Sequence, residues 1–429
     1  MSTSAYPPRP AQPGPGTPGQ VPRGEPRPDR RHGAGFWLIA AALLAGQAFS
    51  TAPAPLYPLY QQRDHFSTFM VTLVFAALAA GVVVSLLLAG HVSDWVGRKR
   101  ILIPAIALEA VASLMFLIWP DLPVLLAGRF VNGLGVGMIT ATATAHLHEL
   151  HARHRPDAAP TRFEIVSTAA NIGGLGFGPL LTGVLAQYAQ QPLRLPFAVF
   201  TVLLLLALVA VAFTPETVEE RPVRPAWRPQ RVRGHGGRTP YLIAAGGAFT
   251  SFAVFGLFNS LAAGFVAGTL HHPGRLLAGV TVFLVFAAAS VSQAAAGRTS
   301  PLARNAIGLG FQAAGLVMLV VAMNTVSLGL FFAGGAVAGA GAGVLFKSAV
   351  GAVTAAAPPT LRGEALAGLF LIAYLGMIVP SIGMGIATEY IAATTAMAWF
   401  TGLLLILMAA TTALLVSSRR RGWRAAVPG

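Results

Sequence analysis

Twelve blocks of about 20 mostly apolar residues constrain the fold of this chain more than any other feature. Hydrophobic residues make up 55% of the 429 residues and charged residues only 10%, whereas soluble domains average about 25% charged residues. About 20 apolar residues in a helix span the roughly 30 Å hydrocarbon core of a bilayer. We therefore predict an all-α membrane protein with twelve transmembrane helices. The expected spans are residues 36–58, 69–90, 101–119, 122–145, 164–187, 195–214, 241–265, 275–296, 304–324, 326–349, 364–388 and 393–416.

Basic residues in the short loops predict the orientation of these spans. The loops that follow odd-numbered spans carry three basic residues, Arg63, Arg194 and Arg275. Nine basic residues occupy the short loops after even-numbered spans: Arg98, Lys99, Arg100, Arg153, Arg155, Arg162, Arg298, Arg304 and Arg362. An excess of Lys and Arg marks the cytoplasmic side, and an even number of spans puts both termini there. We expect a multi-pass protein of the cytoplasmic (inner) membrane with both termini in the cytoplasm.

Polar segments rich in proline and arginine predict the domain organisation. Residues 1–33 have the composition of a disordered cytoplasmic tail. We expect an N-terminal six-helix bundle at 34–216, a flexible cytoplasmic linker at 217–240, a C-terminal six-helix bundle at 241–417 and a cytoplasmic tail at 418–429. The net charge of +15 lies in loops and tails rather than on one folded face. This distribution favours an anionic lipid surface as partner and argues against nucleic acid.

The loop after the second span has a distinctive order of residues. It reads Gly90-x-x-Ser93-Asp94-x-x-Gly97-Arg98-Lys99, and Asp94 is its only acid. Asp94 can therefore pair with the nearby cations or cap a neighbouring helix, and the two glycines permit positive φ. The pattern resembles the loop between the second and third helices of major facilitator superfamily transporters. That resemblance covers residues 36–416. It implies two bundles that alternate access, with this loop biasing the inward-closed state; a cationic turn that serves topology alone is the other interpretation.

The fourth span contains an arginine and an asparagine inside the apolar region. Its segment from Leu125 to Gly135 resembles a second motif of the same superfamily, with Asn132 where glutamine is common. The resemblance implies that Arg129 faces the central cavity and influences proton transfer. A cation that snorkels to the outer membrane interface is the alternative.

The fifth span combines closely spaced glycines with a proline. Gly174-x-x-x-Gly178-Pro179 resembles the superfamily motif associated with exporters that work as antiporters, although Thr182 replaces the first of the two glycines that usually follow. Pro380 in the eleventh span is the expected counterpart of Pro179. Glycines at this spacing are also an ordinary means of close helix packing, so both interpretations stay open.

Glu109 is the only carboxylate well inside any span. A membrane-embedded acid is a candidate proton carrier, but it can also pair with a neighbour for structural reasons. The first span has no acid, unlike the first span of many proton-coupled relatives, so coupling to protons stays open. Phe255 and Asn259 in the seventh span suggest an apolar substrate wall or simple packing. Asn171, Gln293 and Tyr374 are further polar candidates at mid-span.

These observations favour a secondary active transporter that exports a small amphipathic molecule by alternating access, with proton antiport. The alternatives are uptake of a metabolite by proton symport or facilitated diffusion, and, more remotely, a membrane-embedded enzyme or sensor. We expect a monomer with a small-molecule substrate, protons and the lipid bilayer as partners. No nucleophile–base pair or phosphate loop occurs at membrane depth, so the sequence predicts no enzyme activity and no cofactor. Four histidines between 146 and 154 resemble metal ligands, but a polar cytoplasmic loop accounts for them better, and we predict no metal site.

Overall fold

The computed structural model describes residues 30–89, 92–159, 161–218, 229–230, 237–358 and 361–426. Within these ranges, twelve helices are long and apolar enough to cross a membrane. The predicted twelve-span, all-helical fold is therefore confirmed, and the protein is a multi-pass integral membrane protein. Of the predicted loop residues, Gly90 lies outside the described ranges, as does most of the predicted linker and N-terminal tail.

The first half of the chain forms six spans and several short helical pieces. They are α1 (Arg30–Thr51), η1 (Ala54–Leu56), α2 (Tyr57–Asp64), α3 (Thr68–Ala89), α4 (Ser93–Val96), α5 (Arg98–Ile118), α6 (Leu122–His154), α7 (Thr161–Thr168), η2 (Ala169–Gly173), α8 (Gly174–Tyr188) and α9 (Leu195–Phe213). The segments α7, η2 and α8 run on without a break as one span.

The second half repeats this plan. Its elements are α10 (Arg238–Ser260), α11 (Ala262–Gly268), α12 (Arg275–Ala295), η3 (Ala296–Arg298), α13 (Pro301–Asn324), α14 (Leu328–Ala356), α15 (Arg362–Tyr390) and α16 (Ala393–Ala426). Side-chain caps begin several of the long helices. The Asp121 carboxylate accepts from the Val124 N–H at 3.0 Å at the start of α6, and Ser300 and Ser327 cap α13 and α14 in the same way.

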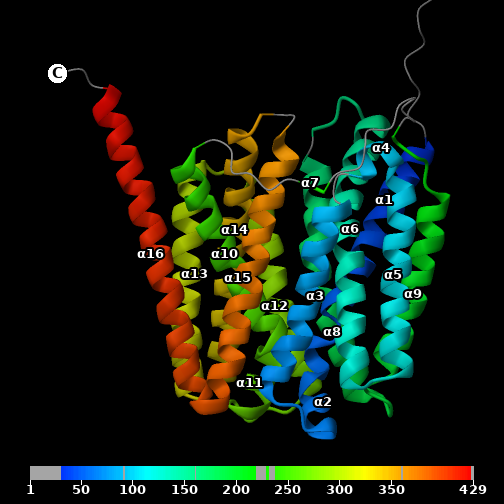
Figure 1. Ribbon diagram of the computed structural model, residues 1–429, viewed down its shortest axis with the longest axis vertical. Coiled ribbons are helices and arrows are strands. Elements are labelled where there is room, and N and C mark those ends of the chain that lie inside the picture. The colour runs from blue at the N-terminus through cyan, green and yellow to red at the C-terminus, as the bar shows by residue number, and fades with distance from the viewer. Residues whose placement is uncertain are drawn as a thin grey trace, which may run out of the picture.

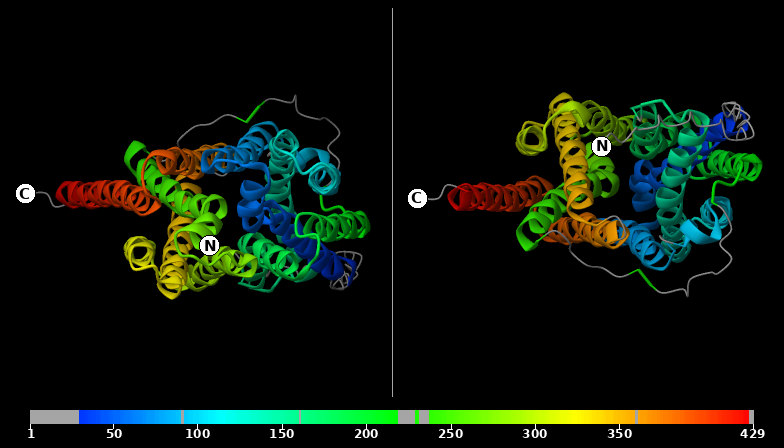
Figure 2. Two further views of the ribbon diagram at one scale, coloured as in Figure 1. Left: turned by 90° about the horizontal axis from the view of Figure 1, so that it is seen from below. Right: turned by 90° about the horizontal axis from the view of Figure 1, so that it is seen from above.

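The spans group into two bundles that stand side by side (Figure 1). The N-bundle contains α1, α3, α5, α6, α8 and α9, and the C-bundle contains α10 and α12 to α16. Both end views in Figure 2 show the two groups, with α16 at the outer edge of the C-bundle. We call the end that carries α4 the α4 end and the end that carries α2 and α11 the α2 end.

The bundles meet along two helix pairs, α8 against α12 and α3 against α15. At the α2 end, the Phe69 N–H of α3 donates to the Glu389 carboxylate of α15 at 3.2 Å. The Arg275 N–H of α12 donates to the Gln187 side chain of α8 at 2.9 Å. A Cβ added to Gly385 of α15 would lie 2.6 Å from the Thr72 hydroxyl of α3. The two bundles are therefore in direct contact at the α2 end.

Several helix boundaries differ from the predicted spans, and the largest difference is at α16, which continues to Ala426 instead of residue 416. The first helix stops at Thr51 rather than at residue 58 because Pro53 and Pro55 interrupt it before α2 begins. The helix α6 continues to His154 and α14 to Ala356, beyond the predicted ends at 145 and 349. The extension of α6 carries mostly polar side chains, which hydropathy excludes from a span, whereas the extension of α14 consists of small and apolar residues apart from Thr354.

Candidate functional site

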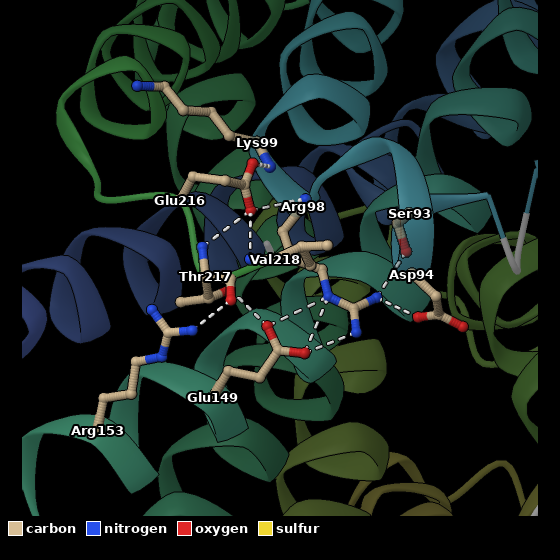
Figure 3. A network of polar contacts seen from close by, with 9 residues as sticks. All are labelled: Ser93, Asp94, Arg98, Lys99, Glu149, Arg153, Glu216, Thr217 and Val218. Atoms are coloured by element: carbon tan, nitrogen blue, oxygen red, sulfur yellow. Dashed lines mark hydrogen bonds and ion pairs between the residues drawn. The ribbon is translucent and has the colours of Figure 1, made fainter. Parts of the chain in front are cut away.

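Arg98 is the centre of a polar network at the α4 end (Figure 3). Its guanidinium Nη1 donates to the Asp94 carboxylate at 2.5 Å and to the Ser93 hydroxyl at 2.8 Å. The Arg98 side chain is only 9% exposed, whereas that of Asp94 is 60% exposed. Gly97 separates α4 from α5 with φ of +117°, in the region that favours glycine. The predicted pairing of Asp94 with a nearby cation is therefore present, and its partner is Arg98.

The same guanidinium also binds α6. Arg98 Nη2 donates to Glu149 Oε1 at 2.7 Å, and Nε contacts both Glu149 oxygens at 3.1 and 3.3 Å. The second Glu149 oxygen accepts from the Thr217 hydroxyl at 2.5 Å, and Arg153 donates to the Thr217 carbonyl at 2.5 Å. A planar guanidinium shared by two carboxylates fixes both the distance and the angle between the segments that carry them.

Glu216 closes the network by capping α5. Its carboxylate accepts from the backbone N–H groups of Arg98 and Lys99 at 3.0 Å each, and from those of Thr217 and Val218 at 2.9 and 3.1 Å. Burial opposes the charge of this carboxylate, but the four N–H donors outweigh that effect, so the pKa of Glu216 lies below its ordinary value. A carboxylate at a helix N-terminus also interacts favourably with the helix dipole.

The network joins the α4–α5 loop, the end of α6 and the chain after α9. The Lys99 ammonium supports the last of these contacts by donating to the Ala212 and Thr214 carbonyls. The structure therefore brings Ser93, Asp94, Gly97, Arg98 and Lys99 together as expected from the loop pattern. Sequence reasoning did not place Glu149, Glu216 or Thr217 there; the helix-ending triplet Pro215-Glu216-Thr217 was the available signal.

Arg129 lies inside the N-bundle and is 1% exposed. Its Nη1 donates to the Ser50 carbonyl of α1 at 2.6 Å and to the Asn132 side chain at 3.3 Å. Arg129 Nε, Asn132 Nδ2 and the Tyr57 hydroxyl are buried without a hydrogen-bond partner among the described residues. This burial argues against a cation that snorkels to the membrane interface. The role of Arg129 and Asn132 in the cavity remains a prediction.

Glu109 lies at the junction of α5, α1 and α6 and is fully buried. Neither carboxylate oxygen has a hydrogen-bond partner in the part of the chain that the structure describes. Two glycines make room for it, because a Cβ added to Gly46 would lie 2.8 Å from Oε2 and one added to Gly135 would lie 2.6 Å from Cγ. A charged carboxylate without a partner would be costly in this position.

The glycines of α8 form two separate faces. Gly174 and Gly178 pack against α1: a Cβ on Gly174 would lie 2.9 Å from Gln47 Cβ, and one on Gly178 would overlap the Ala48 carbonyl. Gly176 and Gly183 face α12 of the other bundle instead. The spacing of each pair explains the difference, because positions four residues apart, like Gly174 and Gly178, or seven apart, like Gly176 and Gly183, share one helix face. One face therefore stabilises the N-bundle and the other forms the contact between bundles.

Pro179 and the helical turn before α8 adapt the fifth span to this packing. A proline cannot donate to the carbonyl four residues earlier. That carbonyl, of Leu175, instead accepts from the Thr51 hydroxyl of α1 at 2.8 Å. Asn171 lies half-buried in η2, a widened π-helical turn of the kind often found at functional sites.

Aromatic side chains gather between the two bundles near the middle of their helices. The Phe252 ring lies 5.4 Å from Tyr374, 5.0 Å from Phe346 and 5.9 Å from Phe255, measured between ring centroids. Phe252 and Tyr374 also pack against an apolar cluster contributed by α3, α6 and α15. We call Phe252, Phe255, Phe346 and Tyr374 the aromatic cluster. Of its members, Phe252 and Phe346 were not among the predicted site residues.

The other candidates in the C-bundle have different surroundings. Asn259 is 5% exposed, and its Oδ1 has no partner among the described residues. The Gln293 side-chain Nε2 donates to the Gly343 carbonyl at 3.3 Å, and the backbone carbonyl of Gln293 accepts from Lys347 Nζ at 2.8 Å. Pro380 lines an apolar pocket of about 400 Å³ between α10, α15 and α16. Gln293 thus joins α12 to α14, whereas Pro380 lies on the α16 side of its helix.

Comparison with known protein families decides the class of this protein. The family model described as Major Facilitator Superfamily matches residues 36–327, which is more than half of the chain. The chain belongs to the Major Facilitator Superfamily. The resemblance to this superfamily inferred from the loop at residues 90–99 is confirmed.

Individual relatives of this superfamily member differ in what their names describe. It is 24% identical over 188 residues to Myo-inositol transporter 2 of Schizosaccharomyces pombe, covering 42% of the chain and 33% of the relative. It is 31% identical over 129 residues to the Arabinose-proton symporter of Bacillus subtilis, covering 28% and 27%. It is 38% identical over 77 residues to the Multidrug resistance protein MdtL of Escherichia coli, covering 18% and 20%. The matches span one third or less of these relatives' lengths.

Proposed function

We propose that this transporter exports a small amphipathic molecule by alternating access, in exchange for protons. The aromatic cluster is the observation that supports the substrate class. Its members come from three helices of the C-bundle, and two of them, Phe252 and Tyr374, pack against α3 and α6 of the N-bundle. Rings and aliphatic side chains suit an apolar or amphipathic compound, because a polyhydroxylated substrate requires a hydrogen-bonding group for most of its hydroxyls.

Uptake of a sugar or polyol by proton symport is the second candidate. It is supported by the names of the relatives that match over 188 and 129 residues. The relative whose name indicates drug resistance is more similar, but over a shorter segment. The two candidates differ in substrate chemistry and in direction, so one assay separates them.

For the orientation, we propose that the α4 end faces the cytoplasm of an inner membrane. Nine basic residues in the short loops at this end, against three in the loops at the α2 end, support this placement. Both termini and the linker at 217–240 would then be cytoplasmic, with bundles at 34–216 and 241–417. We further propose that one chain is the transporting unit.

The network around Arg98 would act in the conformational cycle. It connects three segments of the N-bundle at the α4 end, and Asp94 is the exposed member of its central ion pair. A side chain as exposed as that of Asp94 can exchange partners during a cycle. The Arg98–Glu149 ion pair, in contrast, holds the loop to the bundle. The contacts of Asp94 would therefore bias the state that is closed on the cytoplasmic side.

For coupling, Glu109 is the leading proton carrier. It is fully buried and lacks partners among the described residues. A carboxyl group in such a place is stable when neutral and gains charge only if the surroundings rearrange or hydrate. Binding and release of a proton would then accompany the change of state.

The substrate class is tested by transport into inside-out vesicles with an imposed pH gradient. The probes are ethidium as an amphipathic dye and labelled arabinose and myo-inositol as polyhydroxy compounds. We expect pH-driven accumulation of the dye, which Phe252→Ala reduces. The control is Phe311→Ala, because Phe311 lies on α13 and is 50% exposed. Movement of arabinose or myo-inositol without movement of the dye would contradict export of amphipathic compounds.

Coupling is tested by Glu109→Gln, which is nearly isosteric but cannot ionise. We expect loss of accumulation driven by a pH gradient, while downhill exchange of substrate survives because the aromatic cluster is unchanged. Substrate flux in proteoliposomes with and without a pH step measures both. If the wild-type flux responds to the step and the Gln variant responds equally, the proton travels elsewhere and Glu109 is structural.

A further inference from the structure

A pocket of about 260 Å³ lies at the α4 end, and its lining residues include no member of the Arg98 network or of the aromatic cluster. It is formed where the first turns of α1, the last turns of α6 and the start of α7 meet. Its main lining residues are Gly33, Phe36, Trp37, His151, His154 and Arg162. We call it the interfacial pocket.

Two histidines that line this pocket each have a buried ring nitrogen without a partner among the described residues. His151 is 7% exposed, and its Nε2 is buried without a partner in the described ranges of the chain. The same holds for Nδ1 of His154, whose ring lies against the α1 backbone at Gly33. Buried polar atoms in folded proteins are nearly always hydrogen-bonded. Neither nitrogen has accessible surface in this structure, so a polar ligand in the pocket can reach it only when the ring turns.

The charge around the pocket selects an anion. The Arg162 guanidinium lies 5.3 Å from the Trp37 ring centroid and 5.9 Å from that of Phe36, so two rings hold its plane. The charged neighbours of His151 include Arg155 as well as Arg162. Two arginines would repel a metal ion, and the described residues contain no group of three or more metal-binding side chains. An oxyanion, in contrast, matches the fork of a guanidinium.

We propose that the interfacial pocket binds a phosphate group through Arg162 and His154, with His151 forming part of the pocket wall. The position of Trp37 points to a phospholipid as the source. This side chain is 52% exposed in the second turn of α1, close to the N-terminus of the first span. Exposed tryptophans of membrane proteins concentrate at the depth of the headgroups, where lipid phosphates are abundant. Soluble phosphate carries the same chemistry, and the experiment distinguishes the two sources.

The test measures thermal unfolding of the full-length protein in detergent during titration with short-chain phosphatidylglycerol or with inorganic phosphate. We expect saturable stabilisation of the wild type by the lipid. A response to inorganic phosphate alone would support the same site with a soluble ligand. Arg162→Gln should weaken the apparent affinity about tenfold or more, since it removes a charge-assisted pair. The comparison variant is Arg155→Gln: Arg155 is exposed and does not line the pocket, so it contributes only longer-range positive charge, and its loss should weaken binding less than the loss of Arg162.

A second variant tests the pocket without changing any charge. A Cβ added to Gly33 would lie 2.9 Å from Cε1 and Nε2 of His154, so Gly33→Ala requires that ring to move from its present place in the pocket wall. We expect weaker binding of the phosphate ligand than in the wild type. The proposal is overturned if the wild type shows no saturable response to either ligand. It is also overturned if Arg162→Gln and Arg155→Gln lose the same affinity, or if Gly33→Ala binds like the wild type.

Discussion

Gly183 is the residue at which the contact between the bundles can be tested most directly. It lies near the α2 end of α8, and its nearest neighbours all belong to α12. A Cβ added at this position would lie 2.8 Å from the Arg275 carbonyl and 3.1 Å from Gly279 Cα. Ordinary van der Waals contact begins at 3.4 Å, so Gly183→Ala requires α8 and α12 to separate by about 0.6 Å.

This separation has an energetic cost only while the α2 end is closed. Overpacking of a well-packed contact typically costs about 1–3 kcal/mol. If the alternate state has no such contact, the whole cost shifts the equilibrium towards opening at the α2 end, by about 5- to 150-fold. Gly183→Val should shift it further, because its branched side chain demands more space at the same point.

The absence of cysteine from the sequence provides the assay. A single reporter is introduced as Ala263→Cys, because Ala263 is 2% exposed and lines a pocket at the α2 end with Pro55 and Gln62 of the other bundle. We expect Gly183→Ala to raise the rate at which a membrane-impermeant maleimide labels this cysteine. The control is Gly268→Ala, since a Cβ on Gly268 would meet nothing within 4 Å. Equal labelling rates in the Gly183 and Gly268 variants would refute the proposed opening at this contact.

Three further predictions concern single side chains. Asp94→Asn should leave the protein inserted but slow transport, because Arg98 loses its exposed partner; normal turnover at matched expression would exclude a role in the cycle. Arg129→Ala should abolish transport and Arg129→Lys restore it in part, because a lysine cannot reproduce the planar fork that binds Ser50; full activity of the alanine variant would contradict this. Glu216→Gln should lower thermal stability at neutral pH by about 1 kcal/mol. The lowered pKa of Glu216 means that this difference is present above pH 4.5 and disappears as the pH falls through the lowered value; a pH-independent difference would argue against it.

The spans could be predicted from sequence because bilayer thickness sets their length and apolar character. The pairing within residues 93–98 was also predictable, since Asp94 and Arg98 are four residues apart and share one local turn. The other partners of Arg98 were not, because Glu149 is 51 positions away and Glu216 is 118 positions away. Only the packing of α6 and α9 against α5 brings those carboxylates to the loop.

Tertiary packing also determines the contact partners of residues that the sequence already marked as unusual. Arg129 was recognised as an arginine inside a span, but its acceptor is a backbone carbonyl of α1, and no side-chain pattern reports a carbonyl. The glycines of the fifth span predicted close packing without showing that Gly178 and Gly183 face different bundles. Helical spacing separates the two faces, yet the partner of each face depends on how the helices assemble.

The helices α5 and α6 connect the proposed proton site to the α4 end. They touch at Glu109 and Gly135 in the middle of the bundle and at Arg98 and Glu149 near its end. The two contacts are about 16 Å apart along α5, at 1.5 Å per residue. A packed pair of helices does not deform continuously, so ionisation of Glu109, which requires new room or water beside Gly135, should tilt one helix against the other. We expect that tilt to strain the Arg98–Glu149 pair, whose bidentate geometry tolerates little change in angle, and so to release the loop that carries Asp94.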